Sequence, residues 1–296
     1  MKKGISLLLA GMLALSLAAC GGDSGSGSVG EAGTQEEALS DEEIIAAAQG
    51  IHIGDFEKTL GEYIEGAEAI TEKSWYLVTE ENTDGEVLED LEDDYAYDPE
   101  TERLVCADIT SLMMEFYVGV DPATGEARLV ASFYNGEDDA KSNLANFLYT
   151  SVYSTLTNEE TIAAAESSYL PGYPDATLGE YIQQAILVSG SYSGQMLPAN
   201  MISETVLMFR ERCPEAFHIE TDKIALLTVW IDDLQGNHQL TYRFYVAVND
   251  TTGESTVAAA SAAAWENGRE GDTATRYGSE VEEIADIFME AVNWAG

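Results

Sequence analysis

The sequence TLGEYI occurs twice, at residues 59–64 and again at 177–182, as six identical residues separated by 118 positions. In each occurrence a threonine precedes a glutamate by three residues, which is the capping-box pattern of a helix N-terminus. Leucine, tyrosine and isoleucine then recur three and four residues apart, so they would share one face of that helix. The repeated segment therefore predicts the same amphipathic helix at two places.

The similarity extends on both sides of this segment. Upstream, EEIIAAA at 42–48 resembles EETIAAA at 159–165, and each is preceded by a Ser or Thr that completes a second capping box. Downstream, FYV occurs at 116–118 and at 244–246. The spacing between equivalent segments grows along the chain, which indicates insertions between two copies of one structural unit.

The positions of the repeated segments indicate the domain organisation. We predict a signal peptide at 1–19, a flexible Gly/Ser-rich tether at 20–39, a first copy at 40–155 and a second copy at 156–296. The tether has the composition of a solvated spacer, with no aromatic residue in its Gly/Ser-rich part.

Each copy contains runs that favour β-strands after its two helix starts. They lie at 75–78, in a run that ends with 116–120, and at 128–134 in the first copy, and at 224–231, 240–248 and 254–260 in the second. The last two runs of each copy are joined by a short turn, in which Gly125 or Gly253 can adopt the left-handed conformation of a bulged hairpin. Apolar stripes at 144–152 and 281–292 predict a closing helix. The fold class predicted is α+β, two tandem repeats, each with helices packed on a short antiparallel sheet.

The composition limits the classes of partner that the protein can bind. The chain has 296 residues with 13 Lys plus Arg and 54 Asp plus Glu, a formal net charge of −41 at pH 7. A negative charge of this size repels nucleic acid and anionic membrane surfaces, so we expect no nucleic-acid partner.

The first twenty residues indicate a bacterial lipoprotein. Lys2 and Lys3 precede an apolar run at 5–17 that is too short to span a bilayer. The run ends in Leu-Ala-Ala-Cys at 17–20, which resembles the lipobox, in which Cys20 receives a diacylglycerol and becomes the mature N-terminus. The resemblance implies a protein held by lipid on the extracytoplasmic face of a bacterial membrane.

Two further resemblances concern the copies themselves. The TLGEY helix start, Trp75, the FYV strand and Asn135-Gly136 together resemble repeats of uncharacterised Gram-positive surface lipoproteins, a family that implies no specific activity. The hairpin pattern V-x-V-D-x-x-T-G at 118–125 resembles PepSY domains, which implies a regulator or inhibitor of an extracytoplasmic peptidase. Asn249 departs from that pattern in the second copy.

The densest charge lies at 80–102, with twelve acidic and no basic residues. Glu80, Asn82 and Asp84 occupy positions one, three and five of an EF-hand-like spacing, and they are the candidate cation ligands. Leu91 stands where that motif requires a bidentate glutamate, so we predict a solvated acidic loop rather than a metal site, with Tyr95 and Tyr97 on a short strand beside it.

The remaining chemistry-bearing residues do not form a catalytic motif. Cys106 and Cys213 either form a disulfide that links the two copies or remain two buried thiols. Residues 189–194 resemble a nucleophile elbow only superficially, because Tyr192 occupies the place of the serine, and they predict a flexible loop. We therefore expect no cofactor, no metal and no enzymatic activity.

These features favour one function and leave two alternatives open. The first is a non-enzymatic, lipid-anchored surface protein that binds a protein, peptide or envelope ligand, with the groove between the copies as the expected site. The second is the peptidase regulator that the PepSY-like hairpin implies. The third is a hydrolase that uses paired carboxylates, since 54 acidic residues allow many such pairs.

Overall fold

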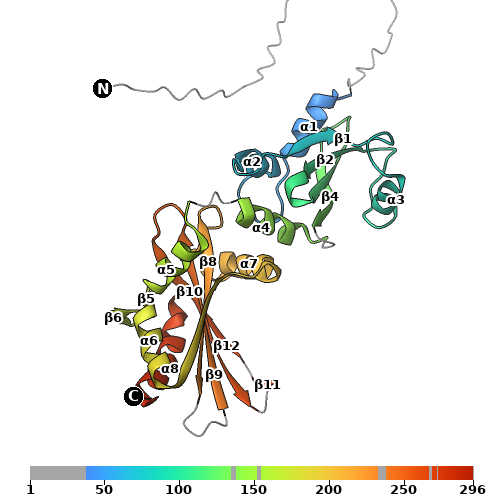
Figure 1. Ribbon diagram of the computed structural model, residues 1–296. Helices are drawn as coiled ribbons and strands as arrows, with labels where there is room; N and C mark the ends of the chain where they lie inside the picture. Colours follow the sequence, from blue (N-terminus) through green and yellow to red (C-terminus); the bar gives the residue numbers. More distant parts are fainter. Residues whose placement is uncertain are drawn as a thin grey trace, which may run out of the picture. The chain divides into compact units, whose positions relative to one another are not determined.

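The computed structural model describes residues 38–134, 138–151, 155–232, 238–266, 269–271 and 273–295 (Figure 1). Residues 38–296 form one unit by their contacts, whereas Cys20 and the predicted signal peptide and most of the tether lie outside the described residues. No helix in the described part of the chain is both long and apolar enough to cross a bilayer.

The repeated TLGEYI segments form equivalent local structures. Thr59 and Thr177 cap α2 (Leu60–Gly66) and α6 (Leu178–Ser189), and both capping boxes are complete. The first amide of each helix donates to a carbonyl two residues beyond the preceding helix: Leu60 N to Ile51 O at 2.8 Å, and Leu178 N to Ser168 O at 2.7 Å. The preceding helices, α1 (Asp41–Gln49) and α5 (Asn158–Glu166), also begin with the predicted capping boxes.

The first copy contains a four-stranded antiparallel sheet in the order β1-β2-β3-β4. Its strands are β1 (Ser74–Leu77), β2 (Arg103–Ile109), β3 (Met114–Val120) and β4 (Ala127–Tyr134). One face packs on α1, α2 and α4 (Ala140–Ser151) through Val105, Phe116 and Val118. The opposite face packs on α3 (Gly85–Asp93), whose Leu91 lies against Leu104 and Tyr117 in a smaller apolar cluster.

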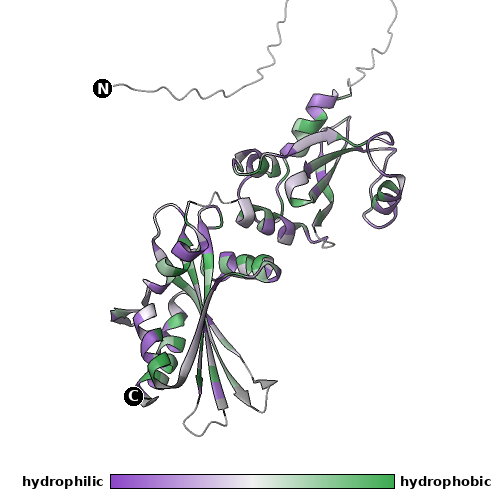
Figure 2. Cartoon of the chain, in the orientation of Figure 1, coloured by the Kyte–Doolittle hydropathy of each residue, from purple (hydrophilic) through white to green (hydrophobic). Residues whose placement is uncertain are grey.

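The second copy contains a larger sheet with the same central order. Strands β7 (Gly190–Met196), β8 (Asp222–Asp232), β9 (His238–Asn249) and β10 (Ser255–Glu266) form an antiparallel meander, and β11 (Arg269–Glu270) and β12 (Ala274–Tyr277) both pair with β10. Helices α5, α6 and α8 (Val281–Ala295) cover one face. Figure 2 shows hydrophobic residues along these strands, and helices that carry both hydrophobic and hydrophilic residues. A short hairpin of β5 (Tyr169–Leu170) and β6 (Tyr173–Thr177) precedes α6.

Helix α7 (Ile202–Arg212) joins the two copies. Phe209 of α7 makes edge contacts with Phe217 and with Tyr245 of β9, at 5.7 and 6.0 Å between ring centroids. The same helix packs against α4, and Val206 and Phe209 share one core with the helices of the first copy. Three short 3₁₀ helices complete the described elements: η1 (Thr110–Leu112), η2 (Ala199–Met201) and η3 (Gly278–Glu280).

The α+β class is confirmed, with antiparallel sheets and covering helices. Both halves contain two helices, a strand, an inserted helix, three strands and a closing helix in that order, and the second half has β5, β6, β11 and β12 in addition. The tandem-repeat arrangement itself stays a prediction. The glycines of the two last hairpins have the predicted left-handed backbone, with φ of 74° at Gly125 and 72° at Gly253. The boundary between the copies at 155/156 stays a prediction, because residues 38–296 form a single unit.

Two local predictions were wrong. The acidic stretch is not a loop beside a strand, because residues 85–93 form α3 and Tyr95 and Tyr97 follow that helix in irregular backbone. Residues 190–196 are not a flexible loop but the strand β7, which pairs with β8 from Gly190–Ile231 to Met196–Ala225.

Candidate functional site

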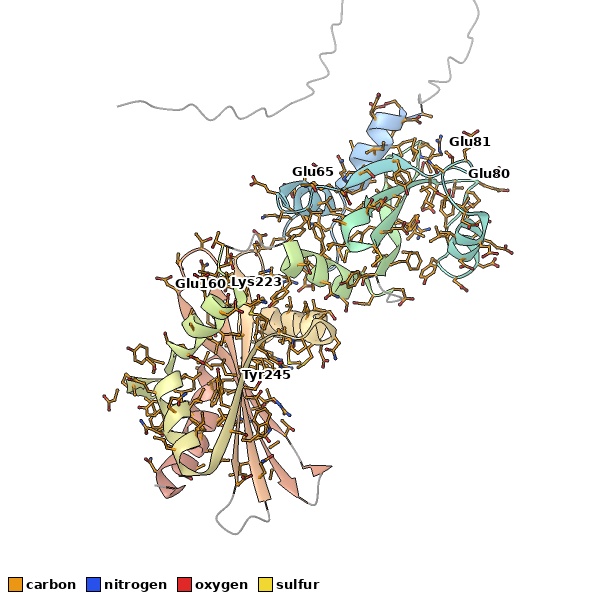
Figure 3. The ribbon with its side chains drawn as sticks, in the orientation of Figure 1. Glu65, Glu80, Glu81, Glu160, Lys223 and Tyr245 are labelled. Carbon is orange, nitrogen blue, oxygen red and sulfur yellow. The ribbon has the colours of Figure 1, made fainter. Side chains whose placement is uncertain are left out.

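The candidate cation ligands serve the local backbone. Asn82 Oδ1 accepts from Thr79 N at 2.7 Å, and its Nδ2 donates to Leu77 O at 2.8 Å, which closes the turn after β1. Asp84 caps α3 by accepting from Glu86 N at 3.1 Å. Glu80 lies exposed at the same turn (Figure 3). Within the described ranges, no three His, Cys, Asp or Glu side chains are grouped so that they could hold a metal ion.

The two described cysteines are free and buried in different apolar clusters. Cys106 lies on β2 between the sheet and α3, and Cys213 lies at the end of α7. Burial raises the pKa of Cys106 to about 12 and that of Cys213 to about 11, because the apolar surroundings disfavour a thiolate. Neither thiol is suited to nucleophilic chemistry at neutral pH.

Two of the carboxylates that line cavities pair with cationic side chains, and a third caps a helix. In a cavity of about 260 Å³ at the end of α2, Glu220 accepts from Lys58 Nζ at 2.7 Å through both oxygens, and Glu62 belongs to the capping box of α2. In another cavity, Glu102 pairs with Arg128 at 2.7 Å. Glu62, Glu102 and Glu220 are thus engaged, and the carboxylate-hydrolase alternative stays a hypothesis.

The four lysines of the described chain differ in their surroundings. Lys58 pairs with Glu220, and Lys141 pairs with Asp55 at 3.1 Å; both side chains are about half exposed. Lys73 Nζ donates to three carbonyls at the end of α2, those of Ile64, Glu65 and Ala67, at 2.6 to 3.1 Å. Lys223 is partly buried, and no carboxylate of the described residues forms an ion pair with it.

Lys223 lines a cavity of about 260 Å³, which we call the Lys223 pocket. Its walls come from the end of α4, the start of α5, the end of β7, the start of α7 and the start of β8. The lining residues are Tyr149, Thr150, Leu156, Asn158, Thr161, Met196, Leu197, Ile202 and Lys223. The pocket therefore uses segments from both copies, and Figure 3 shows Lys223 where β8 begins, near α5 and α7.

Tyr149 fixes the position of the lysine. Lys223 Nζ donates to the Tyr149 carbonyl oxygen at 2.8 Å and lies 5.0 Å from the centroid of the Tyr149 ring. The Tyr149 hydroxyl accepts from Ile224 N at 2.9 Å, so this side chain is held at its far end as well. Burial lowers the pKa of Lys223, and the negative charge of Asp250 opposes that effect.

Asp250 is buried beside this site, at the start of the turn that joins β9 to β10. One carboxylate oxygen, Oδ2, accepts from the backbone and hydroxyl of Thr155, and the Asp250 amide donates to Thr221 O at 2.9 Å. The other oxygen, Oδ1, has no hydrogen-bond partner in the described part of the chain. Asp250 and Lys223 are thus close enough to influence each other without forming an ion pair.

One feature of the sequence that hydrophobic periodicity does not capture marks this site. Lys223 directly precedes the apolar strand run IALL at 224–227 and is one of only four lysines after the signal peptide. Its neighbours Tyr149 and Leu197 are distant in sequence, so the pocket itself emerges only from the tertiary structure.

Comparisons with protein-family models, with curated proteins and with solved structures found no match.

Proposed function

We propose that this protein is a non-enzymatic binding protein, held by lipid on Cys20 at the extracytoplasmic face of a bacterial membrane, and that its ligand occupies the Lys223 pocket. The observation that carries the proposal is a cavity with both apolar and polar walls, which contains an ammonium group that pairs with no carboxylate of the described residues. Apolar walls combined with a small number of placed polar groups are typical of ligand pockets.

The position of the pocket supports the same function. Its walls combine α4 of the first copy with α5, β7, α7 and β8 of the second, so a bound ligand would contact both copies. A predicted tether of about twenty residues would let the folded part move above the membrane surface while it samples ligands.

The anchoring is tested by fractionation of cells that express the full chain or its Cys20→Ala variant. We expect the wild-type protein in the membrane fraction and the variant in the soluble fraction. Equal membrane association of both proteins would contradict lipid anchoring.

Ligand binding is tested by a thermal-shift screen with a library that contains cationic, neutral and anionic small molecules. A pocket-filling variant, Met196→Trp, serves as the comparison, since Met196 lines the pocket and is only partly buried. We expect some compounds to raise the melting temperature of the wild-type protein and not that of Met196→Trp. A library without any such compound would contradict the proposed function.

A further inference from the structure

We propose that the ligand of the Lys223 pocket carries a carboxylate on a short apolar group, with the carboxylate bound to Lys223 Nζ. This inference rests on the proposed function and adds the chemical class of the ligand.

The first step is the charge balance around Lys223. An ammonium group has three N–H donors, and the described residues provide one hydrogen-bond acceptor, the Tyr149 carbonyl oxygen. The Tyr149 ring adds a cation–π contact at 5.0 Å. Charges removed from water are normally paired. In this protein even the half-exposed Lys58 and Lys141 pair with carboxylates. Within the described residues, two donors of Lys223 therefore remain for a further group.

The second step concerns Asp250, the acidic group whose charge acts on Lys223. Its Oδ2 is held by Thr155, and no ion pair of 4.0 Å or less joins it to Lys223. Asp250 is also only 2% exposed, so it cannot move into the cavity without loss of those contacts. The ammonium is thus stabilised at a distance by Asp250 and is still open to an anion in the pocket.

The third step is the choice among anions. A phosphate dianion is normally bound by several cationic or amide donors, whereas this cavity contains one cation and no arginine. The overall charge of −41 further disfavours a multiply charged ligand. A single carboxylate matches a single ammonium, and its two oxygens match the two available donors.

The fourth step is the shape of the rest of the ligand. Leu156, Met196, Leu197 and Ile202 provide apolar walls, and the cavity of about 260 Å³ is slightly smaller than a typical drug-sized pocket. A branched chain of a few carbon atoms fits this volume. Two sources share this chemistry: a free short-chain carboxylic acid and the C-terminal residue of a peptide.

The test is calorimetric titration of the chain that begins after Cys20, which retains the whole unit 38–296. The probes are 4-methylpentanoate and its neutral isostere 4-methylpentanamide for the free acid, and N-acetylglycyl-leucine and its C-terminal amide for the peptide. The protein variants are Lys223→Met, Lys223→Gln and the control Lys141→Met, which removes a half-exposed lysine that is not among the lining residues of the pocket.

We expect at least one carboxylate probe to bind with a Kd below about 10 mM, and binding at least about tenfold weaker for its amide and for both Lys223 variants. Lys141→Met should bind like the wild type. Tighter binding of the free acid would identify a small acid as the ligand source, and tighter binding of the dipeptide would identify a peptide C-terminus.

The inference is overturned if neither carboxylate binds, if an amide binds as tightly as its acid, or if the Lys223 variants retain full affinity. These outcomes would reject the carboxylate ligand and can be distinguished from a result that rejects the binding function of the pocket. Neutral or cationic ligands that stabilise the wild type and not Met196→Trp would preserve the binding role of the pocket and reject only the carboxylate.

Discussion

At the scale of single residues, the TLGEYI repeat is explained by a close contact between two helix ends. A Cβ atom at Gly61 would lie 2.7 Å from Gln49 Cβ and 2.9 Å from Gln49 O, at the last residue of α1. A Cβ atom at Gly179 would lie 3.0 Å from the same two atoms of Glu166, the last residue of α5. Threonine and glutamate cap the helix, glycine allows the approach, and the three apolar residues enter the core.

We therefore predict that Gly61→Ala and Gly179→Ala each lower the free energy of unfolding by about 1–3 kcal/mol, the usual cost of overpacking. The measurement is urea-induced unfolding followed by circular dichroism. Gly66→Ala is the matched control, since a Cβ atom there meets nothing within 4 Å and alanine favours the helix. Gly61→Ala and Gly179→Ala with the stability of the wild type would reject this account of the repeat.

The thiols give a second prediction at this scale. Cys106 and Cys213 are buried with a raised pKa, so neither should react with a thiol reagent at pH 8 in the folded protein. Both should react after denaturation without reductant. The chain that begins after Cys20 should then consume two equivalents of the thiol reagent. Zero equivalents after denaturation would instead indicate a disulfide.

The same groups determine the response to alkaline pH. A thiol whose pKa is raised by folding favours the folded state fully below its ordinary value of 9.0, and this contribution is lost as pH rises toward about 11 for Cys213 and about 12 for Cys106. Tyr149, whose pKa burial raises to about 12, loses its contribution between pH 10 and 12. We expect the free energy of unfolding to fall from pH 8 to pH 10.5. In Cys213→Ala, this decrease from the variant's own value at pH 8 should be smaller than in the wild type. An unchanged pH dependence in that variant would contradict the assignment.

At the scale of elements, the sequence predicted a helix, strand or turn correctly where the local conformational propensity of the residues agrees with their tertiary environment. The capping boxes, the strands with β-branched and aromatic residues, and the glycine turns were all predictable from local patterns. Helix α3 was missed because its acidic residues suggested a solvated loop, although Val87, Leu88 and Leu91 share the face that packs on the sheet. Strand β7, with the sequence GSYSGQM, has weak strand propensity and forms because β8 pairs along its full length.

The attachment of α3 is testable through Leu91, which is fully buried under the helix. We predict that Leu91→Ala costs about 2–4 kcal/mol in the free energy of unfolding and increases amide hydrogen exchange mainly in residues 85–93. Glu89→Ala, on the exposed side of the same helix, should change neither. Unchanged exchange at 85–93 in Leu91→Ala would show that this contact does not hold α3.

At the scale of the whole molecule, the fold class was predictable and the site was not. Tyr149, Leu197 and Lys223 lie in three separate segments, and only the packing of α4 and α7 around the start of β8 brings them together. The groove between the copies was predicted as the binding region, but neither its lining nor the role of Lys223 followed from motif or periodicity. The expected lipid anchor and binding role stay predictions that the experiments above decide.

The net charge of the molecule predicts how its thermal stability depends on salt concentration. With a net charge of −41, repulsion between carboxylates opposes folding, and an increase of NaCl from 0.01 to 0.15 M shortens the Debye length from about 30 to about 8 Å. We expect the melting temperature to rise by at least about 2 °C over this range at pH 7. The same concentration step in sucrose serves as a control for effects other than screening. A melting temperature that stays constant or falls with NaCl would show that repulsion is not a major destabilising factor.

The most direct test of the central claim is the titration of Lys223 itself, by NMR of protein labelled with ¹³C at the lysine ε-carbon. The chain that begins after Cys20 contains four lysines, so each signal can be assigned by substitution. We predict a pKa for Lys223 below 10.5 in the free protein and an increase when 4-methylpentanoate saturates the pocket, whereas Lys58, whose pKa Glu220 raises, stays protonated at pH 10. A pKa of Lys223 at or above 10.5 in the free protein, without response to the carboxylate, would contradict an ammonium that no carboxylate of the described residues pairs with and that binds an anionic ligand.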